Sequence, residues 1–345
     1  MKYKRLGNTG LKVSEICLGA MTFGLKFFNI GEVNQEGANR LVAQALEAGV
    51  NFFDTADVYS FGESEEVLGR ALKQAGARRD AVVIATKVRS PMSEAAMTGA
   101  VSVSELNNVG LSRQHIFSAC EASLRRLGMD HIDLYQVHGW DAATPMEETL
   151  RALDDLVRQG KVLYLGCSNW AARQIAKALQ MAQGHDWNRF ISLQAYYSLV
   201  GRDLEHELLP LCREEGLAVL PWSPLSGGFL TGKFRRNQSA PAGARRAGFD
   251  FPPIDQERAF DAVDALEAVA KEMGKTIAQA ALAWLLAQPG VTSVIVGAKR
   301  ESQLKENLGA ADATLTSDQL AQLSSATAPR ILYPQWMIER QNMNR

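Results

Sequence analysis

Short apolar runs rich in β-branched residues alternate with amphipathic stretches along most of the chain. Strands that are apolar on both faces and are followed by helices are typical of a parallel sheet covered by helices. The pattern predicts eight strands, at 16–19, 51–54, 81–87, 132–138, 162–167, 191–196, 217–222 and 293–297. Eight such repeats in 345 residues favour an α/β fold of the (β/α)8 TIM-barrel type over an open sheet.

Turn and capping residues mark the ends of several stretches. Thr144–Glu147 reads as a capping box with proline at the first helical position, and Gly160 ends the helix that follows. Ser112–Gly128 shows the same punctuation. Near the N-terminus, Tyr3–Arg5 and Leu11–Val13 flank a Gly-Asn-Thr-Gly turn, which predicts a β-hairpin that closes the bottom of the barrel.

Two connections, 88–111 and 224–256, are too long to be simple linkers. Loops of this length in compact domains are usually functional or disordered. No low-complexity tract or short repeat divides the chain, so we expect one domain, residues 1–345.

Charge and composition narrow the classes of partner. The net charge is −1, whereas nucleic-acid and membrane-surface proteins favour a basic excess, so we expect neither partner. The N-terminal residues lack an apolar signal-peptide core, and the apolar helical stretch Thr276–Ala287 is too short to cross a bilayer. The four scattered cysteines favour free thiols in the cytoplasm and argue against structural zinc.

Four ionisable residues fall at or just beyond the ends of neighbouring predicted strands: Asp54, Tyr59, Lys87 and His138. Each one alone has an ordinary structural interpretation, as a loop cap, a snorkelling lysine or a satisfied polar residue. The active sites of (β/α)8 barrels lie at the carboxyl ends of the strands, so the four together predict a catalytic group.

The chemistry of this group points to protonation of a carbonyl oxygen. A tyrosine has a pKa of about 10, and a neighbouring ammonium lowers it, so we expect Lys87 to tune Tyr59 as a proton donor. A buried ammonium needs a partner, which Asp54 can provide, and His138 adds a second donor. No side chain supplies a hydride, so a nicotinamide cofactor is the expected source.

The sequence resembles the aldo-keto reductase superfamily over nearly its whole length, in its bacterial and fungal aryl-alcohol dehydrogenase-like branch. The motifs are FFDTADVYSFGESEEVLGRAL (52–72), IATK (84–87), DLYQVH (133–138), GCSN (166–169), PWSPLSGGFLTGK (221–233) and VGAKRESQLKEN (296–307). The resemblance implies a catalytic tetrad of the four residues above, with Tyr59 as the proton donor.

The same resemblance implies a binding site for the nicotinamide. It places Ser168, Asn169 and Gln194 at the carboxamide, although Ser168 and Asn169 would also suit helix capping. It places Trp222 against the nicotinamide ring, where an aromatic residue could instead simply fill the barrel. The remaining cofactor contacts in this stretch are Ser223, Pro224 and Leu225.

Residues 227–234 nearly spell a P-loop, but Phe234 stands where a magnesium-binding Ser or Thr is required. We therefore reject nucleotide hydrolysis and expect Gly228 and Lys233 to lie against the cofactor pyrophosphate. The resemblance suggests that the basic segment beyond, 235–253, folds over the cofactor.

A predicted anion site follows the last strand, where Gly297, Lys299 and Arg300 open a helix. It suits the 2′-phosphate of NADP(H), with Glu306 and Asn307 nearer the adenine, although an ordinary solvated helix start reads the same way. Some family members have an arginine at the position of Gln303. The expected preference for the 2′-phosphate therefore depends on Lys299 and Arg300.

The leading interpretation is an NADP(H)-dependent reductase of aldehydes and ketones that also oxidises alcohols. A non-catalytic regulatory subunit of the potassium-channel β type is the alternative, because such subunits share the fold and tetrad. A metal-dependent hydrolase is disfavoured because no His-x-His pair is present. Met21, Phe23, Tyr59, Trp140 and Trp222 predict an aromatic substrate pocket, whereas the physiological substrate, reaction direction and oligomeric state stay open.

Overall fold

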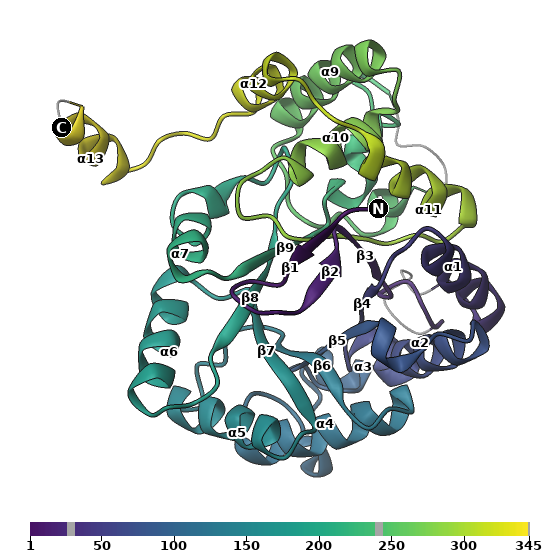
Figure 1. Cartoon of the computed structure of the whole chain (residues 1–345), viewed down its shortest axis with the longest axis vertical. Helices are drawn as coiled ribbons and strands as arrows, with labels where there is room; N and C mark the ends of the chain where they lie inside the picture. The colour runs from purple at the N-terminus through teal and green to yellow at the C-terminus, as the bar shows by residue number, and fades with distance from the viewer. Residues whose placement is uncertain (26–31, 239–243, 344–345) are drawn as a thin grey trace.

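Eight parallel strands form a nearly closed barrel with helices around it, which confirms the predicted (β/α)8 fold (Figure 1). The computed structural model describes residues 1–25, 32–238 and 244–343. The strands are β3 (Ile16–Gly19), β4 (Phe52–Asp54), β5 (Val83–Val88), β6 (Ile132–Val137), β7 (Val162–Ser168), β8 (Phe190–Tyr196), β9 (Ala218–Trp222) and β10 (Val294–Val296). They pair in the order β10-β3-β4-β5-β6-β7-β8-β9, and a bridge from Val219 to Val291 brings β9 next to β10.

The helices lie around the strands and bury apolar residues against them, except the last, which has no buried residue and stands away from the barrel (Figure 1). They are α1 (Gln35–Glu47), α2 (Glu63–Gln74), α3 (Glu94–Met97), α4 (Arg113–Leu127), α5 (Met146–Arg158), α6 (Ala172–Gly184), α7 (Leu208–Glu215), α8 (Arg245–Gly248), α9 (Gln256–Met273), α10 (Ile277–Leu286), α11 (Glu301–Leu308), α12 (Ser317–Ala326) and α13 (Gln335–Asn342). Six 3₁₀ turns are described: η1 (Tyr59–Gly62), η2 (Arg79–Ala81), η3 (Val103–Glu105), η4 (Asp203–Glu205), η5 (Ser226–Thr231) and η6 (Gly309–Asp312). No helix within the described ranges combines the length and apolar character needed to span a bilayer.

The capping residues explain where α4 and α5 begin. The Ser112 side chain accepts a hydrogen bond from the His115 amide, and Gly128 ends α4 with a φ of 67°, as predicted. The predicted capping box of α5 is wrong. Pro145 itself is the cap, and no side chain caps the helix, because the Thr144 hydroxyl donates to Asp141 instead, at 2.7 Å.

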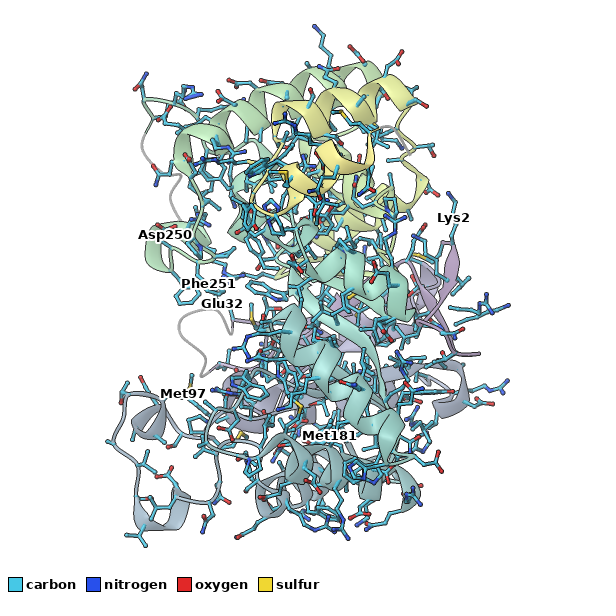
Figure 2. The ribbon with its side chains drawn as sticks, turned by 90° about the vertical axis from the view of Figure 1, so that its left-hand side faces the viewer. Lys2, Glu32, Met97, Met181, Asp250 and Phe251 are labelled. Carbon is cyan, nitrogen blue, oxygen red and sulfur yellow. The ribbon has the colours of Figure 1, made fainter. Side chains whose placement is uncertain are left out.

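An antiparallel hairpin of β1 (Tyr3–Arg5) and β2 (Lys12–Ser14) closes one end of the barrel. Leu6 and Val13 are fully buried and pack with Phe52 and the other side chains inside the barrel. The two views place this hairpin, with Lys2, on the side opposite to Glu32, Met97 and Phe251 (Figures 1 and 2). The amino ends of the strands are therefore covered, and the carboxyl ends are left to the loops.

The two long connections lie at the open end. The first contains α3 and η3, and the second contains η5 and α8. Residues 239–243 of the basic segment lie outside the described part of the chain. The four cysteines are all buried free thiols, as predicted.

Candidate active site

The barrel brings Asp54, Lys87, Tyr59 and His138 together at its open end. Asp54 ends β4, Lys87 lies near the end of β5, His138 follows β6, and Tyr59 begins η1. Asp54, Tyr59 and His138 line a cleft of about 850 Å³, with Lys87 buried behind them. The strand-end positions that the sequence singled out thus converge on one site.

Lys87 is the centre of the hydrogen-bond network. Its side chain is fully buried, and Nζ donates to Asp54 Oδ1 at 2.5 Å, to the Thr55 carbonyl at 2.8 Å and to the Tyr59 hydroxyl at 3.4 Å. An ammonium has three hydrogens, so these three acceptors satisfy it completely. The geometry leaves Lys87 in one position, directly beside the phenol oxygen.

Asp54 is held equally firmly through its second oxygen. Oδ2 accepts from Gln136 Nε2 at 3.0 Å and from Gln194 Nε2 at 2.8 Å. The donors come from β6 and β8, so the carboxylate is tied to strands on both sides of the barrel interior. Asp54 therefore cannot turn away from Lys87 without breaking buried hydrogen bonds.

The backbone of η1 holds Tyr59 over this network. Ser60 and Phe61 both have positive φ angles, 49° and 53°, which non-glycine residues rarely adopt. The Ser60 hydroxyl donates to the Phe23 carbonyl, which ties η1 to the loop after β3. The Tyr59 ring meets His138 edge-on, with 5.7 Å between ring centroids.

The pKa of Tyr59 is raised and not lowered, in contrast to the prediction from the sequence. Burial raises the pKa of Tyr59, and this effect outweighs the lowering by the Lys87 charge. Burial alone would lower the pKa of Lys87, but the Asp54 carboxylate raises it above its usual value. Burial, together with the positive charges of Lys87 and Arg89, holds the pKa of His138 well below 6.5. At neutral pH the site therefore contains a protonated phenol, an ammonium and a neutral imidazole.

The residues predicted at the nicotinamide line the middle of the cleft. Ser168 Oγ is buried and has no hydrogen-bond partner among the described residues. Asn169 already donates to the His138 carbonyl at 3.0 Å and accepts from the Trp222 indole at 3.1 Å. The Trp222 ring packs against Tyr196 and lies parallel to Phe251, at a centroid distance of 5.6 Å. The indole on which we expect the nicotinamide to stack is thus already in contact with Tyr196 and Phe251.

The other end of the cleft is cationic. Lys233, Lys299 and Arg300 line it, and burial together with the charges of the other two lowers the pKa of Lys233. Gly228 has a φ of 90°, and a Cβ there would meet Lys233 Nζ at 3.0 Å, so glycine lets the ammonium approach. Cations gathered at one point favour an anionic ligand.

Lys299 is not free, because Glu32 forms an ion pair with it at 2.5 Å. The Lys299 backbone amide also donates to Gln303 Oε1, at 2.9 Å. The rest of the predicted cofactor set also lines the cleft: Ser223, Pro224, Leu225, Gly297, Glu306 and Asn307.

Two of the predicted substrate-pocket residues do not reach the cleft. The Phe23 ring is fully buried in the core, and Trp140 packs edge-on against Trp170. Met21 does line the cleft, beside Met97, Phe249 and Phe251.

Known proteins resemble this chain over nearly its full length. The family model described as "Aldo/keto reductase family" matches residues 15–328. The chain belongs to the aldo/keto reductase family.

Among its curated relatives is a versiconal hemiacetal acetate reductase of Aspergillus parasiticus, 36% identical over 97% of this chain and 99% of the relative. A putative aryl-alcohol dehydrogenase of Schizosaccharomyces pombe is 34% identical over 95% of this chain and 96% of the relative. A probable voltage-gated potassium channel subunit beta of Arabidopsis thaliana is 39% identical, over 90% of this chain and 92% of the relative. Membership of the aldo/keto reductase family supports an oxidoreductase that acts on small carbonyl compounds with a nicotinamide cofactor.

Sequence reasoning missed three residues of this aldo/keto reductase site. Gln136 holds Asp54, Glu32 pairs with Lys299, and Arg245 lines the cleft. Gln136 carried one available signal, because it is a polar residue inside an otherwise buried strand. Glu32 lies in an irregular segment and Arg245 begins the four-residue helix α8, and both segments are too short for a periodicity that would indicate side-chain direction.

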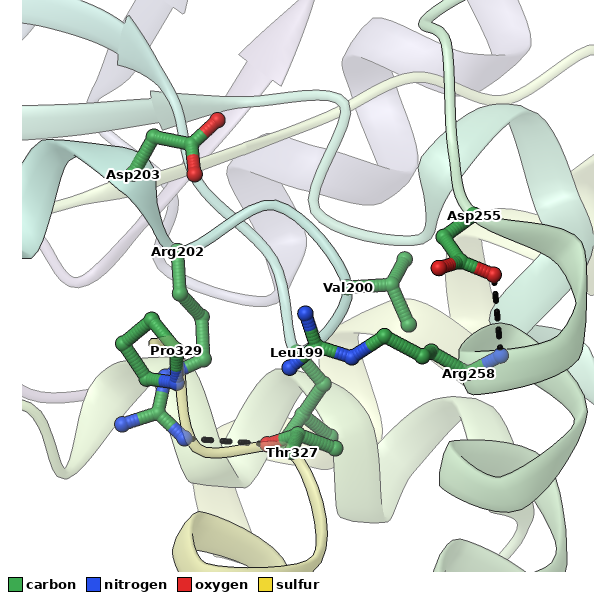
Figure 3. A pocket seen from close by; sticks show the side chains of 8 residues that line it. All are labelled: Leu199, Val200, Arg202, Asp203, Asp255, Arg258, Thr327 and Pro329. Atoms are coloured by element: carbon green, nitrogen blue, oxygen red, sulfur yellow. Dashed lines mark hydrogen bonds between the residues drawn. The ribbon is translucent and has the colours of Figure 1, made fainter. Parts of the chain in front are cut away.

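A second cavity, of about 60 Å³, lies between the loop after β8, the start of α9 and the segment after α12 (Figure 3). Arg202 donates there to the Thr327 hydroxyl and the Ser324 carbonyl, and Asp255 caps the Arg258 amide. The Arg202 contacts fasten the end of α12 to the loop after β8. Within the described ranges, no three His, Cys, Asp or Glu side chains lie close enough together to hold a metal ion.

Proposed function

We propose that this aldo/keto reductase is an NADP(H)-dependent carbonyl reductase, with Tyr59 as the general acid. The observation that carries the proposal is the buried Asp54–Lys87 pair, whose ammonium contacts the hydroxyl of a tyrosine that lines the cleft. A buried cation beside a phenol favours the phenolate that forms when the proton leaves. The same arrangement serves alcohol oxidation in reverse, where the phenolate accepts the proton.

Each of the four residues has a separate role in the proposed reaction. The Tyr59 hydroxyl donates its proton to the carbonyl oxygen, and Lys87 stabilises the negative charge left on the phenol oxygen. Asp54 keeps Lys87 charged and in place, and the neutral imidazole of His138 donates a hydrogen bond that orients the carbonyl oxygen. When it is bound, the nicotinamide cofactor supplies the hydride to the carbonyl carbon.

The cleft fits this cofactor in two respects. The unpartnered Ser168 Oγ needs a polar partner, and an amide group would satisfy it beside Asn169 and Gln194. The cations at the far end match a 2′-phosphate, with Lys299 and Arg300 at the start of α11 and Lys233 facing them. The preference for NADP(H) over NAD(H) follows from these three cations.

Charge changes at this end are expected to alter NADPH binding and leave NADH binding unchanged. The double variant Lys299→Ala/Arg300→Ala should raise the NADPH dissociation constant roughly 10- to 100-fold, since each charge-assisted bond contributes about 1.5–3 kcal/mol. Glu32→Gln should lower the NADPH dissociation constant, by up to roughly fivefold, because it frees Lys299 from an exposed ion pair. Fluorescence titration with both cofactors measures each effect.

Lys305→Ala is the matched control, because Lys305 is an exposed cation of the same helix that does not line the cleft. Equal weakening of both cofactors in the double variant would contradict the phosphate site. So would a wild type that prefers NADH.

The pKa directions predict different pH profiles for the two reaction directions. The imidazole stays neutral and the phenol stays protonated across neutral pH, so kcat/KM for reduction should be flat from about pH 6 to 9. Alcohol oxidation needs the phenolate, so its rate should rise about tenfold per pH unit below the Tyr59 pKa, which lies above 10. Steady-state rates in both directions across this range test the assignment. An inflection near pH 6.5 that disappears in His138→Asn would show that His138 titrates.

Turnover of aldehydes and ketones with NADPH tests the proposed function as a whole. The resemblance to potassium-channel β subunits makes a binding protein without turnover the competing possibility. Cofactor binding without reduction of any member of a varied aldehyde panel would support that alternative.

A further inference from the structure

The last segment of the chain stands away from the barrel (Figure 1). It consists of residues 331–343, here called the C-terminal arm, and contains α13, which has no buried residue. The hydrogen bonds described for the arm stay within it, as does the contact between the Tyr333 and Trp336 rings. The last described hydrogen bond to the barrel comes before it, where Arg258 donates to the Ala328 carbonyl at 2.8 Å. The arm therefore adds little to the stability of its own barrel.

Large apolar side chains are concentrated on the arm. Six of them within these 13 residues are between 44% and 74% exposed: Ile331, Leu332, Tyr333, Trp336, Ile338 and Met343. Exposed apolar side chains are ordinary when they are scattered, whereas a contiguous group of them marks an interaction site. We therefore expect a partner surface to cover the arm.

A second group of exposed apolar side chains lies on the loop between β5 and α4. Val101, Val103 and Leu106 are between 43% and 87% exposed, and residues 98–108 are here called the loop patch. Figure 2 shows Met97, directly before the patch, at the open end of the barrel. The other large apolar residues described as exposed lie singly in separate segments: Tyr3, Leu25, Leu163 and Phe251. The arm and the loop patch are thus the two apolar clusters that the described part of the chain leaves uncovered.

The two surfaces carry opposite charges. Residues 328–343 have a net positive charge, from Arg330 and Arg340, whereas residues 90–112 contain two glutamates and no lysine or arginine. Arg330, Arg340 and Glu94 are exposed. Opposite charges on two apolar surfaces favour their pairing and disfavour the pairing of like surfaces, arm with arm or patch with patch.

The arm is too short to cover the loop patch of its own chain. Extended residues 329–334 span at most about 20 Å, and the eight residues of α13 add about 12 Å. A globular chain of this length is about 50 Å across. The arm lies in its upper half and Met97 in its lower half, along the vertical axis that the two views share (Figures 1 and 2). A second copy of the chain brings an identical patch within reach.

We propose that the protein is a dimer in which the C-terminal arm of each copy docks on the loop patch of its partner. Exchange in both directions satisfies a two-fold axis, so the assembly closes and both apolar clusters are buried in both copies. Each copy contributes the 13 residues of its arm and the 11 of its patch, which is within the roughly 20–30 residues per side of a standard interface. The dimer does not depend on the proposed reductase function.

The oligomeric state of the full chain tests the proposal directly. Light scattering after size exclusion should give the wild type, at about 50 μM, twice the chain mass of 37.7 kDa, because interfaces of this size bind at micromolar concentration or tighter. Trp336→Ser/Ile338→Ser and Val103→Ser/Leu106→Ser should each raise the dimer dissociation constant roughly 100-fold or more. Leu163→Ser is the matched control, because Leu163 is an exposed apolar residue outside both clusters, and it should leave the dimer unchanged.

The same variants should keep an intact barrel. None of the changed side chains is buried or lines the cleft, so Tm and NADPH affinity should match those of the wild type. A loss of dimer without a change in either quantity separates docking from folding.

Cross-linking between differently tagged chains identifies the two surfaces. One chain carries Trp336→Cys and the other Val103→Cys, and a short bismaleimide should join them after the chains are mixed and equilibrated. The four native cysteines are buried, so the introduced thiols are the reactive ones. Neither variant alone should cross-link to the same extent.

A monomeric wild type, or a dimer that survives both double substitutions, would overturn the proposal. A cross-link formed in equal yield by Trp336→Cys alone would also overturn it, because the arms would then pair with each other. So would a monomer that binds phosphatidylglycerol vesicles through Trp336 and Ile338, which would assign the arm to a lipid surface.

Discussion

Replacing Tyr59 with phenylalanine should lower kcat for aldehyde reduction roughly 100- to 10,000-fold, the usual contribution of a general acid. The hydroxyl is the group that contacts Lys87 Nζ, so the variant keeps the ring and its contact with His138 but loses the proton donor. The NADPH dissociation constant should change little, because the predicted cofactor contacts come from other strands and from α11. Single-turnover reduction followed at the nicotinamide absorbance measures the loss.

Tyr135→Phe is the matched control. Tyr135 is a fully buried tyrosine of β6 outside the cleft, and its hydroxyl has no hydrogen-bond partner in the described part of the chain. Removing it should leave both kcat and stability close to wild type. A Tyr59→Phe variant as active as this control would refute the assignment of the general acid.

Replacing Lys87 with methionine should lower the free energy of unfolding by about 3–5 kcal/mol, in addition to the loss of activity. The change leaves the Asp54 carboxylate buried, with only the two glutamine amides as donors. Asp54→Asn in the same chain should recover part of the loss, because it removes the uncompensated charge. Urea unfolding at pH 7, with the m-value compared between variants, measures both effects.

The exposed pair of Arg78 and Asp80 provides the comparison for Lys87. Its side chains are 79% and 70% exposed, so Arg78→Met should leave the free energy of unfolding close to that of the wild type. If Lys87→Met lowered the free energy of unfolding no more than Arg78→Met does, the buried Asp54–Lys87 pair would not stabilise the fold, which would contradict the prediction.

The sequence predicted those parts of the protein that depend on periodicity and on strand ends. Apolar runs locate the strands, and parallel strands bring their carboxyl ends to one edge, so Asp54, Lys87 and His138 could be placed near one another without coordinates. The hairpin followed in the same way from its turn residues and flanking strands.

The directions of individual side chains, and the balance between burial and nearby charge that sets the Tyr59 pKa, could not be predicted from the sequence. Phe23 and Trp140 are in suitable segments, but their rings point into the core and toward Trp170. The sign of the Tyr59 pKa shift depends on how far burial outweighs the Lys87 charge, and burial is known only from the fold. The Thr144 hydroxyl donates a hydrogen bond to Asp141 and does not cap α5, because the loop brings the Asp141 carboxylate within hydrogen-bonding distance.

The side-chain hydrogen bonds that the structure describes for Asp54 run to residues of β5, β6 and β8 and do not involve the long loops. Arg245, Met97 and Phe251, which shape the mouth of the cleft, lie entirely in those loops. The reacting group and the surface that selects its substrate are thus separate modules of one chain. Loops transplanted from a relative should exchange substrate preference while the proton-transfer apparatus stays assembled, so the barrel can serve as a host for engineered reductases.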